Sequence, residues 1–359
     1  MTVLKKNDIP RAENNEELLR WHSDVFLNKE QGEKIYRDIR KNFKTSPHPF
    51  CGWRGFPNQN LDTIITNRYG LRSPDFDFNQ NKKKICILLG GSLAWGYGAT
   101  KNENTPAFLI KEYLNKLGQD FEIVCLAQNS HNSFDELRSF ISYVDELKPK
   151  LVITLSGVND IWQVAKRKYN KNQLLHTQVV DFFNWGQSIK IISHYKNKIT
   201  SLIRFLLFFF FSTDKKLEHD FYQFDYQDNI PIALLEHKIT VMNAYCEIKN
   251  IKAIHVLQPH LFFKKEKSKT EQNYLDFWIK EKSDEVISYE KFKYYLNYFK
   301  DNFYLEEKNT KNTKYISSLD FFDDCKQSIF FDIAHISDEG NKILSKKIVS
   351  KINNFLTHA

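Results

Sequence analysis

Short apolar runs alternate with amphipathic stretches from about residue 82 to the end of the chain. Near-continuous apolar runs predict buried strands at 85–89, 121–127, 151–155 and 251–257. Helical periodicity predicts helices at 105–117, where Pro106 suits the first turn, at 133–147 and at 341–352. This alternation predicts an α/β fold: a three-layer, doubly wound, flavodoxin-like parallel sheet.

Three stretches interrupt this rhythm. Residues 1–80 are polar and aromatic, and we interpret them as an N-terminal extension packed on the core domain at 81–359. Within the extension we expect one or two amphipathic helices between 16 and 42, an irregular turn at 51–57, and a strand or hairpin at 63–71. Residues of about 163–235 and 261–325 hold no clear further strand. We interpret both as helical insertions that cap the carboxyl edge of the sheet.

The first insertion contains a strongly apolar segment from Ile199 to Phe211, flanked by lysines. It is shorter than the ~20 residues that an ordinary transmembrane helix needs. Its length favours a helix buried in the cap or at a subunit contact. The alternative is an interfacial segment that lies on a membrane or holds an acyl chain.

Charge and cysteine content narrow the class of protein. The net charge is +8, with lysines scattered along the chain, which favours a solvated surface over a nucleic-acid partner. Five cysteines without C-x-x-C spacing argue against a disulfide framework or a zinc site. The N-terminus lacks the apolar core of a secretory signal. We therefore expect a cytoplasmic location, with membrane association open and the oligomeric state undetermined.

Candidate chemistry begins with Ser92. Gly90-Gly91-Ser92 directly follows the first predicted strand, so a tight glycine turn presents this hydroxyl at the carboxyl end of the strand. Ligands bind at that edge in open α/β sheets. Ser92 is therefore a candidate nucleophile, provided that a base, an orienting carboxylate and an oxyanion hole are also present.

Those partners occur elsewhere in the sequence. Asp332 precedes His335 by three residues, so its carboxylate can orient the imidazole within one turn. Asn159 follows the third strand, and its side-chain amide can donate to a developing oxyanion. The Ser92 backbone N–H and an N–H from the loop at 127–133 are further candidate donors.

Together these blocks resemble the SGNH (GDSL-type) serine hydrolase superfamily. The resemblance rests on residues 90–99, the loop after the second strand, residues 157–160 and residues 332–335. It covers roughly 82–162 and 320–355. It implies that Ser92 is the nucleophile, His335 the base and Asp332 its orienting partner, with Asn159 in the oxyanion hole. No metal and no organic cofactor is implied.

The chain departs from the family pattern at two positions. It has Gly-Gly-Ser where many members have Gly-Asp-Ser, which leaves the nucleophile unaffected. Ser130 aligns with a glycine whose N–H contributes to the oxyanion hole. Any non-proline residue can donate this N–H, but the backbone conformation at the position can favour glycine.

Three further residues are weaker candidates for substrate binding. Trp95 and Tyr97 follow Ser92 closely and can either stack on a sugar ring or pack against the next helix. His260 follows the fourth strand and can line the site.

The resemblance implies a serine esterase that acts through an acyl-serine intermediate. We expect it to remove an acyl group, such as acetyl, from a small-molecule ester, a carbohydrate or a lipid-linked glycan. One alternative is an O-acyltransferase that uses the same triad. Another is a non-catalytic binding protein that retains the fold.

Overall fold

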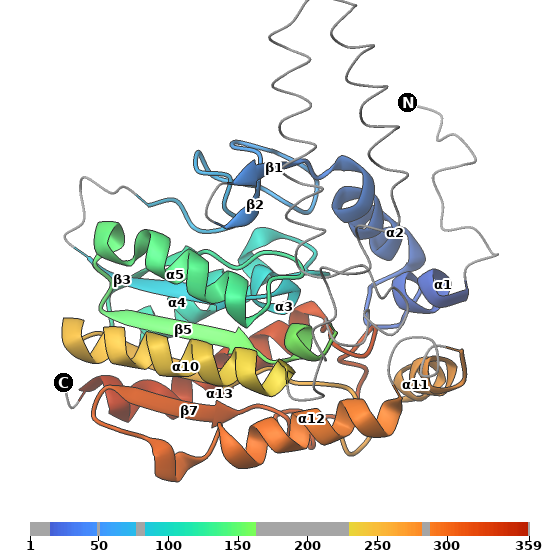
Figure 1. Cartoon of the computed structure of the whole chain (residues 1–359). Coiled ribbons are helices and arrows are strands. Elements are labelled where there is room, and N and C mark those ends of the chain that lie inside the picture. Colours follow the sequence, from blue (N-terminus) through green and yellow to red (C-terminus); the bar gives the residue numbers. More distant parts are fainter. Residues whose placement is uncertain (1–14, 49–50, 77–82, 163–229, 282–287, 358–359) are drawn as a thin grey trace, which may run out of the picture.

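A computed structural model describes residues 15–48, 51–76, 83–162, 230–281 and 288–357. In this part of the chain, five parallel strands form one sheet in the order β4-β3-β5-β6-β7 (Figure 1). The strands are β3 (Lys84–Gly90), β4 (Phe121–Cys125), β5 (Leu151–Ser156), β6 (Lys252–Leu257) and β7 (Thr313–Ser317). The predicted parallel α/β sheet is confirmed.

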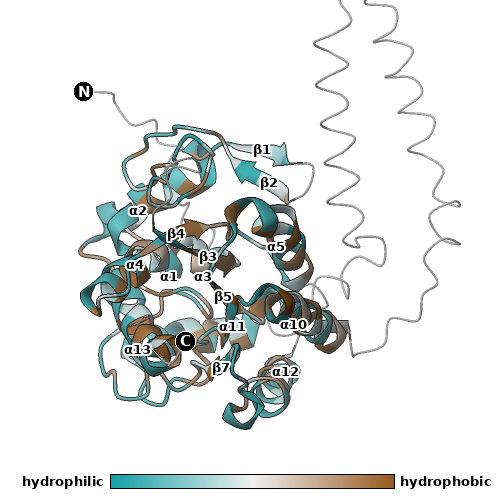
Figure 2. Cartoon of the chain, turned by 90° about the vertical axis from the view of Figure 1, so that its left-hand side faces the viewer, coloured by the Kyte–Doolittle hydropathy of each residue, from teal (hydrophilic) through white to brown (hydrophobic). Residues whose placement is uncertain are grey.

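Helices cover both faces of the sheet and complete three layers (Figure 2). On one face α4 (Pro106–Lys116) contacts α13 (Asp338–Thr357). On the other face α5 (Ser133–Leu147) contacts α10 (Ile230–Lys249). The three helices predicted from the sequence therefore form. The predicted ends of α5 are reproduced, and those of α4 and α13 differ by one to five residues.

Strand residues alternate between the two layers. In β3, Ile85, Ile87 and Leu89 belong to the core cluster under α5 and α10. Cys86 and Leu88 belong to the cluster under α4 and α13. Because both faces are covered, the positions from Ile85 to Leu89 are all apolar, and this continuous run predicted the strand from the sequence.

The second insertion contains a strand that the sequence analysis missed. β7 lies within 261–325 and pairs only with β6, at the edge of the sheet. It carries polar Thr313, Lys314 and Ser317, so it lacks the apolar run of a central strand. The same stretch forms the expected helices, α11 (Lys269–Glu281) and α12 (Tyr289–Asn302). Figure 1 shows α11 beyond the end of the sheet toward which the arrowhead of β5 points.

The first insertion is described only from residue 230. The segment from Ile199 to Phe211 lies outside the described residues, so its role stays a prediction. Among the helices that the structure does describe, none has the length and apolar character needed to cross a membrane.

The N-terminal part forms two helices where the pattern predicted them, α1 (Asn15–Trp21) and α2 (Lys29–Arg37). The irregular turn predicted at 51–57 is wrong, because β2 (Gly52–Gly55) pairs with β1 (Thr45–His48) as an antiparallel hairpin. The strand or hairpin predicted at 63–71 is also wrong, since only an isolated bridge from Asn60 to Ile65 forms there. The structure also has short helices at η1 (Asp38–Asn42), η2 (Asn102–Asn104) and η3 (Glu306–Lys308).

The N-terminal part contributes to the core. Trp21, Phe26 and Ile35 are buried in the same cluster as the strands of the sheet. Division of the chain near residue 80 into an extension and a core domain stays a prediction.

Arg72 links this N-terminal part to the segment after β3. It is 1% exposed. Its guanidinium donates to the carbonyl oxygens of Thr63 and Gly96, both at 2.7 Å, and lies 4.7 Å from the ring centroid of Trp95. Burial lowers the pKa of Arg72 to about 10. The two carbonyl oxygens accept hydrogen bonds from its charged guanidinium. These bonds hold the chain that immediately follows the candidate nucleophile.

Candidate active site

Ser92 follows β3 on a turn that only glycine fits. Gly90 has a φ of +148°, and a Cβ there would lie 2.5 Å from the carbonyl oxygen of Leu155. A Cβ on Gly91 would lie 2.1 Å from Nδ2 of Asn159. The two glycines therefore let the turn approach β5 closely. Ser92 then begins the short helix α3 (Ser92–Trp95) at the carboxyl edge of the sheet.

The structure brings Ser92, His335 and Asp332 together. Oγ of Ser92 lies 2.7 Å from Nε2 of His335, and Nδ1 of His335 lies 2.7 Å from Oδ2 of Asp332. This is the order of hydroxyl, imidazole and carboxylate in which a serine can pass its proton to a histidine. The three candidates named from the sequence therefore form one continuous hydrogen-bonded chain.

Asp332 is held by its own turn. Its Oδ1 accepts the backbone N–H groups of Ala334 at 2.8 Å and His335 at 2.7 Å. Asp332 is 2% exposed, and burial by itself raises the pKa of the carboxyl. His335, Arg20 and the hydrogen bonds outweigh burial and hold that pKa well below its usual range. The carboxylate is therefore charged and ready to stabilise an imidazolium on His335.

Asn159 lies where an oxyanion donor is expected. Its Nδ2 donates one hydrogen to the carbonyl oxygen of His131 at 2.8 Å and packs against Gly91, next to Ser92. A carboxamide nitrogen carries two hydrogens, so a second remains for a developing oxyanion. The N–H of Ser92 opens α3, where a helix provides no internal acceptor.

Ser130 occupies a left-handed backbone conformation. Its φ is +64°, and it lies in the turn between β4 and α5, beside His131. For residues other than glycine this conformation costs about 1–2 kcal/mol. The position therefore has the backbone geometry that favours glycine, although serine occupies it.

Trp95 and Tyr97 do not have the exposure that stacking on a substrate needs, which corrects the sequence-based expectation. Trp95 is 1% exposed and packs between Phe43 and the guanidinium of Arg72. Tyr97 is 8% exposed, and its ring centroid lies 4.3 Å from that of His335. Tyr97 therefore supports the candidate base rather than a sugar ring.

His260 is likewise buried and does not present a surface to substrate. Its ring packs against Phe262 and Phe292, with centroids 4.2 and 4.9 Å away. Burial lowers its pKa to about 3, as it also does for His131 in the loop after β4. Both imidazoles are therefore neutral at neutral pH, and the imidazole that bonds to Oγ of Ser92 is that of His335.

A buried polar cluster lies beneath the loop that carries Asn159. Nζ of Lys238 on α10 lies 3.0 Å from Oε2 of Glu136 on α5. Oγ of Ser156, at the end of β5, donates to the same carboxylate oxygen at 2.6 Å. Burial raises the pKa of Glu136, and the ammonium of Lys238 opposes this rise. The cluster thus ties α5, α10 and β5 together under the site.

Asp160 extends this cluster to the start of α5. Its carboxylate accepts the backbone N–H and the hydroxyl of Ser133, both at 3.0 Å. Burial and the nearby charge of Glu136 raise the pKa of Asp160 to about 7. The protonation of Asp160 in the folded chain therefore changes near neutral pH.

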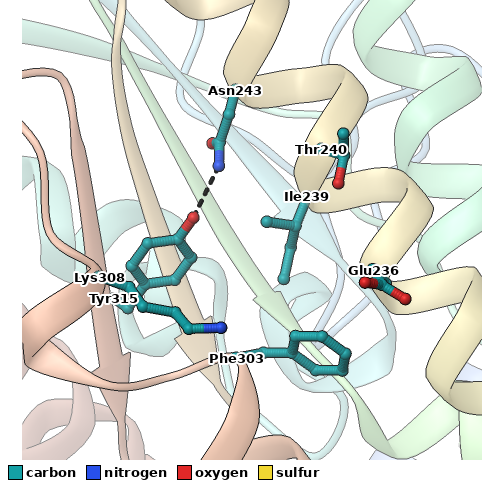
Figure 3. A pocket seen from close by; sticks show the side chains of 7 residues that line it. All are labelled: Glu236, Ile239, Thr240, Asn243, Phe303, Lys308 and Tyr315. Atoms are coloured by element: carbon teal, nitrogen blue, oxygen red, sulfur yellow. Dashed lines mark hydrogen bonds between the residues drawn. The ribbon is translucent and has the colours of Figure 1, made fainter.

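One open cavity lies away from the triad, between α10, β7 and the end of α12 (Figure 3). It has a volume of about 360 Å³ and shares no lining residue with the candidate site. Nδ2 of Asn243 donates to the hydroxyl of Tyr315 at its base, at 2.7 Å. The lining residues are Glu236, Ile239, Thr240, Asn243, Phe303, Lys308 and Tyr315.

Sequence analysis missed Arg20. Its Nε lies 3.2 Å from Oδ2 of Asp332, although the two residues are far apart in the chain. Arg20 sits beside Glu16 and Glu17 in an amphipathic helix, where an arginine ordinarily indicates a solvated ion pair. Nothing in that local pattern pointed to the candidate triad.

No protein-family model and no curated protein matches the chain. Several solved structures are similar in fold. A lipase from a goat rumen metagenome is 13% identical, with 75% of this chain and 97% of that chain covered and a TM-score of 0.43. A catalytic mutant of an acetylxylan esterase from Geobacillus stearothermophilus is 11% identical, with 75% and 94% covered and a TM-score of 0.40.

A GDSL-like lipase from Bacteroides thetaiotaomicron is 12% identical, with 78% of this chain and 92% of that chain covered and a TM-score of 0.36. Identities and TM-scores this low carry no conclusion about function. The function is inferred from the residues of the site.

We predict that Ser130→Gly keeps the fold and raises the free energy of unfolding by up to about 1 kcal/mol, because relief of the left-handed strain exceeds the entropy cost of glycine. Ser130→Val should lower it by about 1–2 kcal/mol, since a β-branched residue tolerates positive φ poorly. Denaturant unfolding measures both. Ser46 in β1 is the matched control, where glycine should destabilise more than valine. The same order at both serines would contradict the prediction.

We predict that Asp160→Asn removes a pH dependence of stability. The pKa of Asp160 is raised in the folded state, so unfolding releases its proton between about pH 4 and 7. The stability that the protonated carboxyl contributes is therefore full below about pH 4 and lost as pH rises through 7. Relative to Asp160→Asn, the wild type should lose on the order of 4 kcal/mol over this range.

Denaturant unfolding at several pH values measures the difference between the two proteins. Asp145→Asn, on the exposed surface of the same α5 helix, is the control and should follow the wild type between pH 5 and 8. Parallel curves for the wild type and Asp160→Asn would show that Asp160 does not titrate in this range.

Proposed function

We propose that this chain is a serine ester hydrolase of the SGNH type. The proposal rests on one observation: the hydrogen-bonded chain from Ser92 through His335 to Asp332, with both links at 2.7 Å. Ser92 and His335 are 243 positions apart in the sequence, so only the fold brings them together. A hydroxyl in this setting is an activated nucleophile.

In the first step Ser92 Oγ attacks the ester carbonyl carbon while His335 Nε2 takes its proton. Asp332 stabilises the resulting imidazolium through Nδ1. The tetrahedral intermediate collapses, the alcohol oxygen leaves, and the imidazolium returns the proton to it. The products of this step are the free alcohol and an acyl-serine ester.

Negative charge on the carbonyl oxygen requires donors before the alcohol leaves. The free hydrogen of Asn159 Nδ2 and the N–H of Ser92 are the nearest candidates, and a backbone N–H at Ser130 is the third. Donors held in place by the fold stabilise an oxyanion more than water does, because they need not reorient.

A water molecule completes the reaction. His335 takes a proton from the water as it attacks the acyl carbonyl, and the same donors hold the second oxyanion. Collapse of this intermediate releases the carboxylic acid and returns the proton to Ser92. Apart from the ester and this water molecule, every group in the cycle belongs to this chain.

The proposed substrate is more specific than the geometry of the triad by itself requires. We propose an acyl ester, such as an acetyl ester, carried by a carbohydrate or a lipid-linked glycan. The resemblance of the motifs to SGNH hydrolases is what supports this choice of substrate. The O-acyltransferase alternative uses the same first step and differs only in the acceptor, which is a hydroxyl instead of water.

A fluorophosphonate probe tests the nucleophile. The native chain should react at one serine, and Ser92→Ala should abolish labelling and lower kcat by about 10⁴-fold or more. Ser142→Ala is the matched control, because this serine lies on α5 and its hydroxyl donates to the carbonyl oxygen of Arg138. An unlabelled but folded native chain, or equal labelling of Ser92→Ala, would refute the assignment.

An ester panel tests the acyl group and the acceptor. We expect kcat/KM for p-nitrophenyl acetate to exceed that for the dodecanoate by at least about 10-fold, because a pocket shaped for acetyl excludes added methylenes. Acetylated sugars should release acetate. A preference for the long chain would favour a lipase, and transfer of the acetyl group to an added sugar would favour an acyltransferase.

A further inference from the structure

Arg20 points at the carboxylate of the proposed triad from outside the core sheet. Its Nε lies 3.2 Å from Oδ2 of Asp332, the oxygen that also faces Nδ1 of His335 at 2.7 Å. Oδ1 is already occupied by two backbone N–H groups. Arg20 therefore places a second cationic or donor-bearing side chain beside this oxygen, and its contact with Oδ2 is an ion pair rather than a hydrogen bond.

Several groups fix the guanidinium in this place. It lies 3.1 Å from Oε1 of Glu16 and 3.8 Å from Oε1 of Glu17, on the same helix. It also donates to the hydroxyl of Tyr274 on α11 at 3.3 Å, and that hydroxyl donates to Glu16 at 3.2 Å. The side chain of Arg20 is only 15% exposed. Contacts from α1 and α11, which pack together, thus hold it toward Asp332 (Figure 1).

The next residue supports the imidazole from the same helix. Trp21 is fully buried, and its ring centroid lies 5.8 Å from that of Tyr97 and 5.3 Å from that of Phe331. Tyr97 in turn packs on the ring of His335, with centroids 4.3 Å apart. Arg20 therefore contacts the carboxylate of Asp332 directly. Trp21 supports the imidazole of His335 through Tyr97.

We propose that Arg20 is a positioning residue for the proposed catalytic base: it fixes Oδ2 of Asp332 and sets the charge around His335. This inference rests on the proposed hydrolase function. A guanidinium beside the carboxylate lowers the pKa of Asp332, so the group that orients the imidazole stays ionised.

Other charged or titratable groups also face this pair. They come from four further parts of the chain, and among the described residues Arg20 is the fixed cation paired with Asp332. They are Ser92 after β3, Tyr97 after α3, His260 after β6 and Tyr274 on α11, with Glu16 and Glu17 behind Arg20.

The test follows the rate of fluorophosphonate labelling, and the rate and KM of p-nitrophenyl acetate hydrolysis. Arg20→Gln should lower both rates by about 10- to 100-fold at pH 7, because the carboxylate is no longer held in place. KM for p-nitrophenyl acetate should stay near the native value, because Arg20 acts on Asp332 and not on the ester. Arg20→Lys keeps the charge and should recover part of the rate.

Arg40→Gln is the matched control. Arg40 pairs with the same Glu17, at 3.5 Å, but its side chain is 53% exposed and this ion pair does not reach Asp332. It should keep the native rate and the native KM. Thermal unfolding of each variant separates a loss of fold from a change at the site.

Each outcome decides the inference. A native rate for Arg20→Gln would overturn it while leaving the hydrolase proposal intact. An equal loss of rate in Arg20→Gln and Arg20→Lys, or a change that falls on KM alone, would reduce Arg20 to a structural contact and also overturn it. A folded native chain that neither labels nor hydrolyses ester would overturn the proposed function and this inference together.

Discussion

The parallel pairing of β3 with β5 is the constraint on which the candidate site depends. The chain leaves β3 toward β4 and returns to form β5 on the opposite side, so the strand order reverses between them, which is where ligands bind in open α/β sheets. Ser92 and Asn159 follow these two strands and therefore meet there. Gly90 and Gly91 let the turn after β3 approach β5 and Asn159 closely enough for this meeting, since side chains at either position would collide with them.

Buried charge makes stability and chemistry depend on the same contacts. A carboxylate buried like that of Asp332 is costly unless it is paired and hydrogen-bonded. Here the imidazole, two backbone N–H groups and Arg20 surround it. Glu136 and Lys238 repeat this solution under the loop of Asn159. The loop of Asn159 and the loop of Asp332 and His335 are thus each supported by a buried ion pair that joins separate elements of the fold.

Burial explains where the sequence-based expectations failed. Trp95 and Tyr97 lie close to Ser92 along the chain, which made them candidates for contact with substrate. Arg72 covers the ring of Trp95, and Tyr97 packs between Trp21 and His335. Arg72 and Trp21 come from the N-terminal part, and no local sequence pattern reveals how that part packs on the site. β7 was missed for a related reason, because an edge strand with one neighbour needs no continuous apolar run.

Local features were determined by the sequence itself: the apolar runs of the central strands, the glycine turn before Ser92, and the turn in which Asp332 binds the N–H of His335 three residues later. Each depends on interactions within a few residues, so a pattern can reveal it. The meeting of Ser92 with His335, the burial of His260 and the ion pair from Arg20 to Asp332 were decided only by the tertiary structure. They depend on how distant elements pack around a shared core, and no short stretch of sequence contains that information.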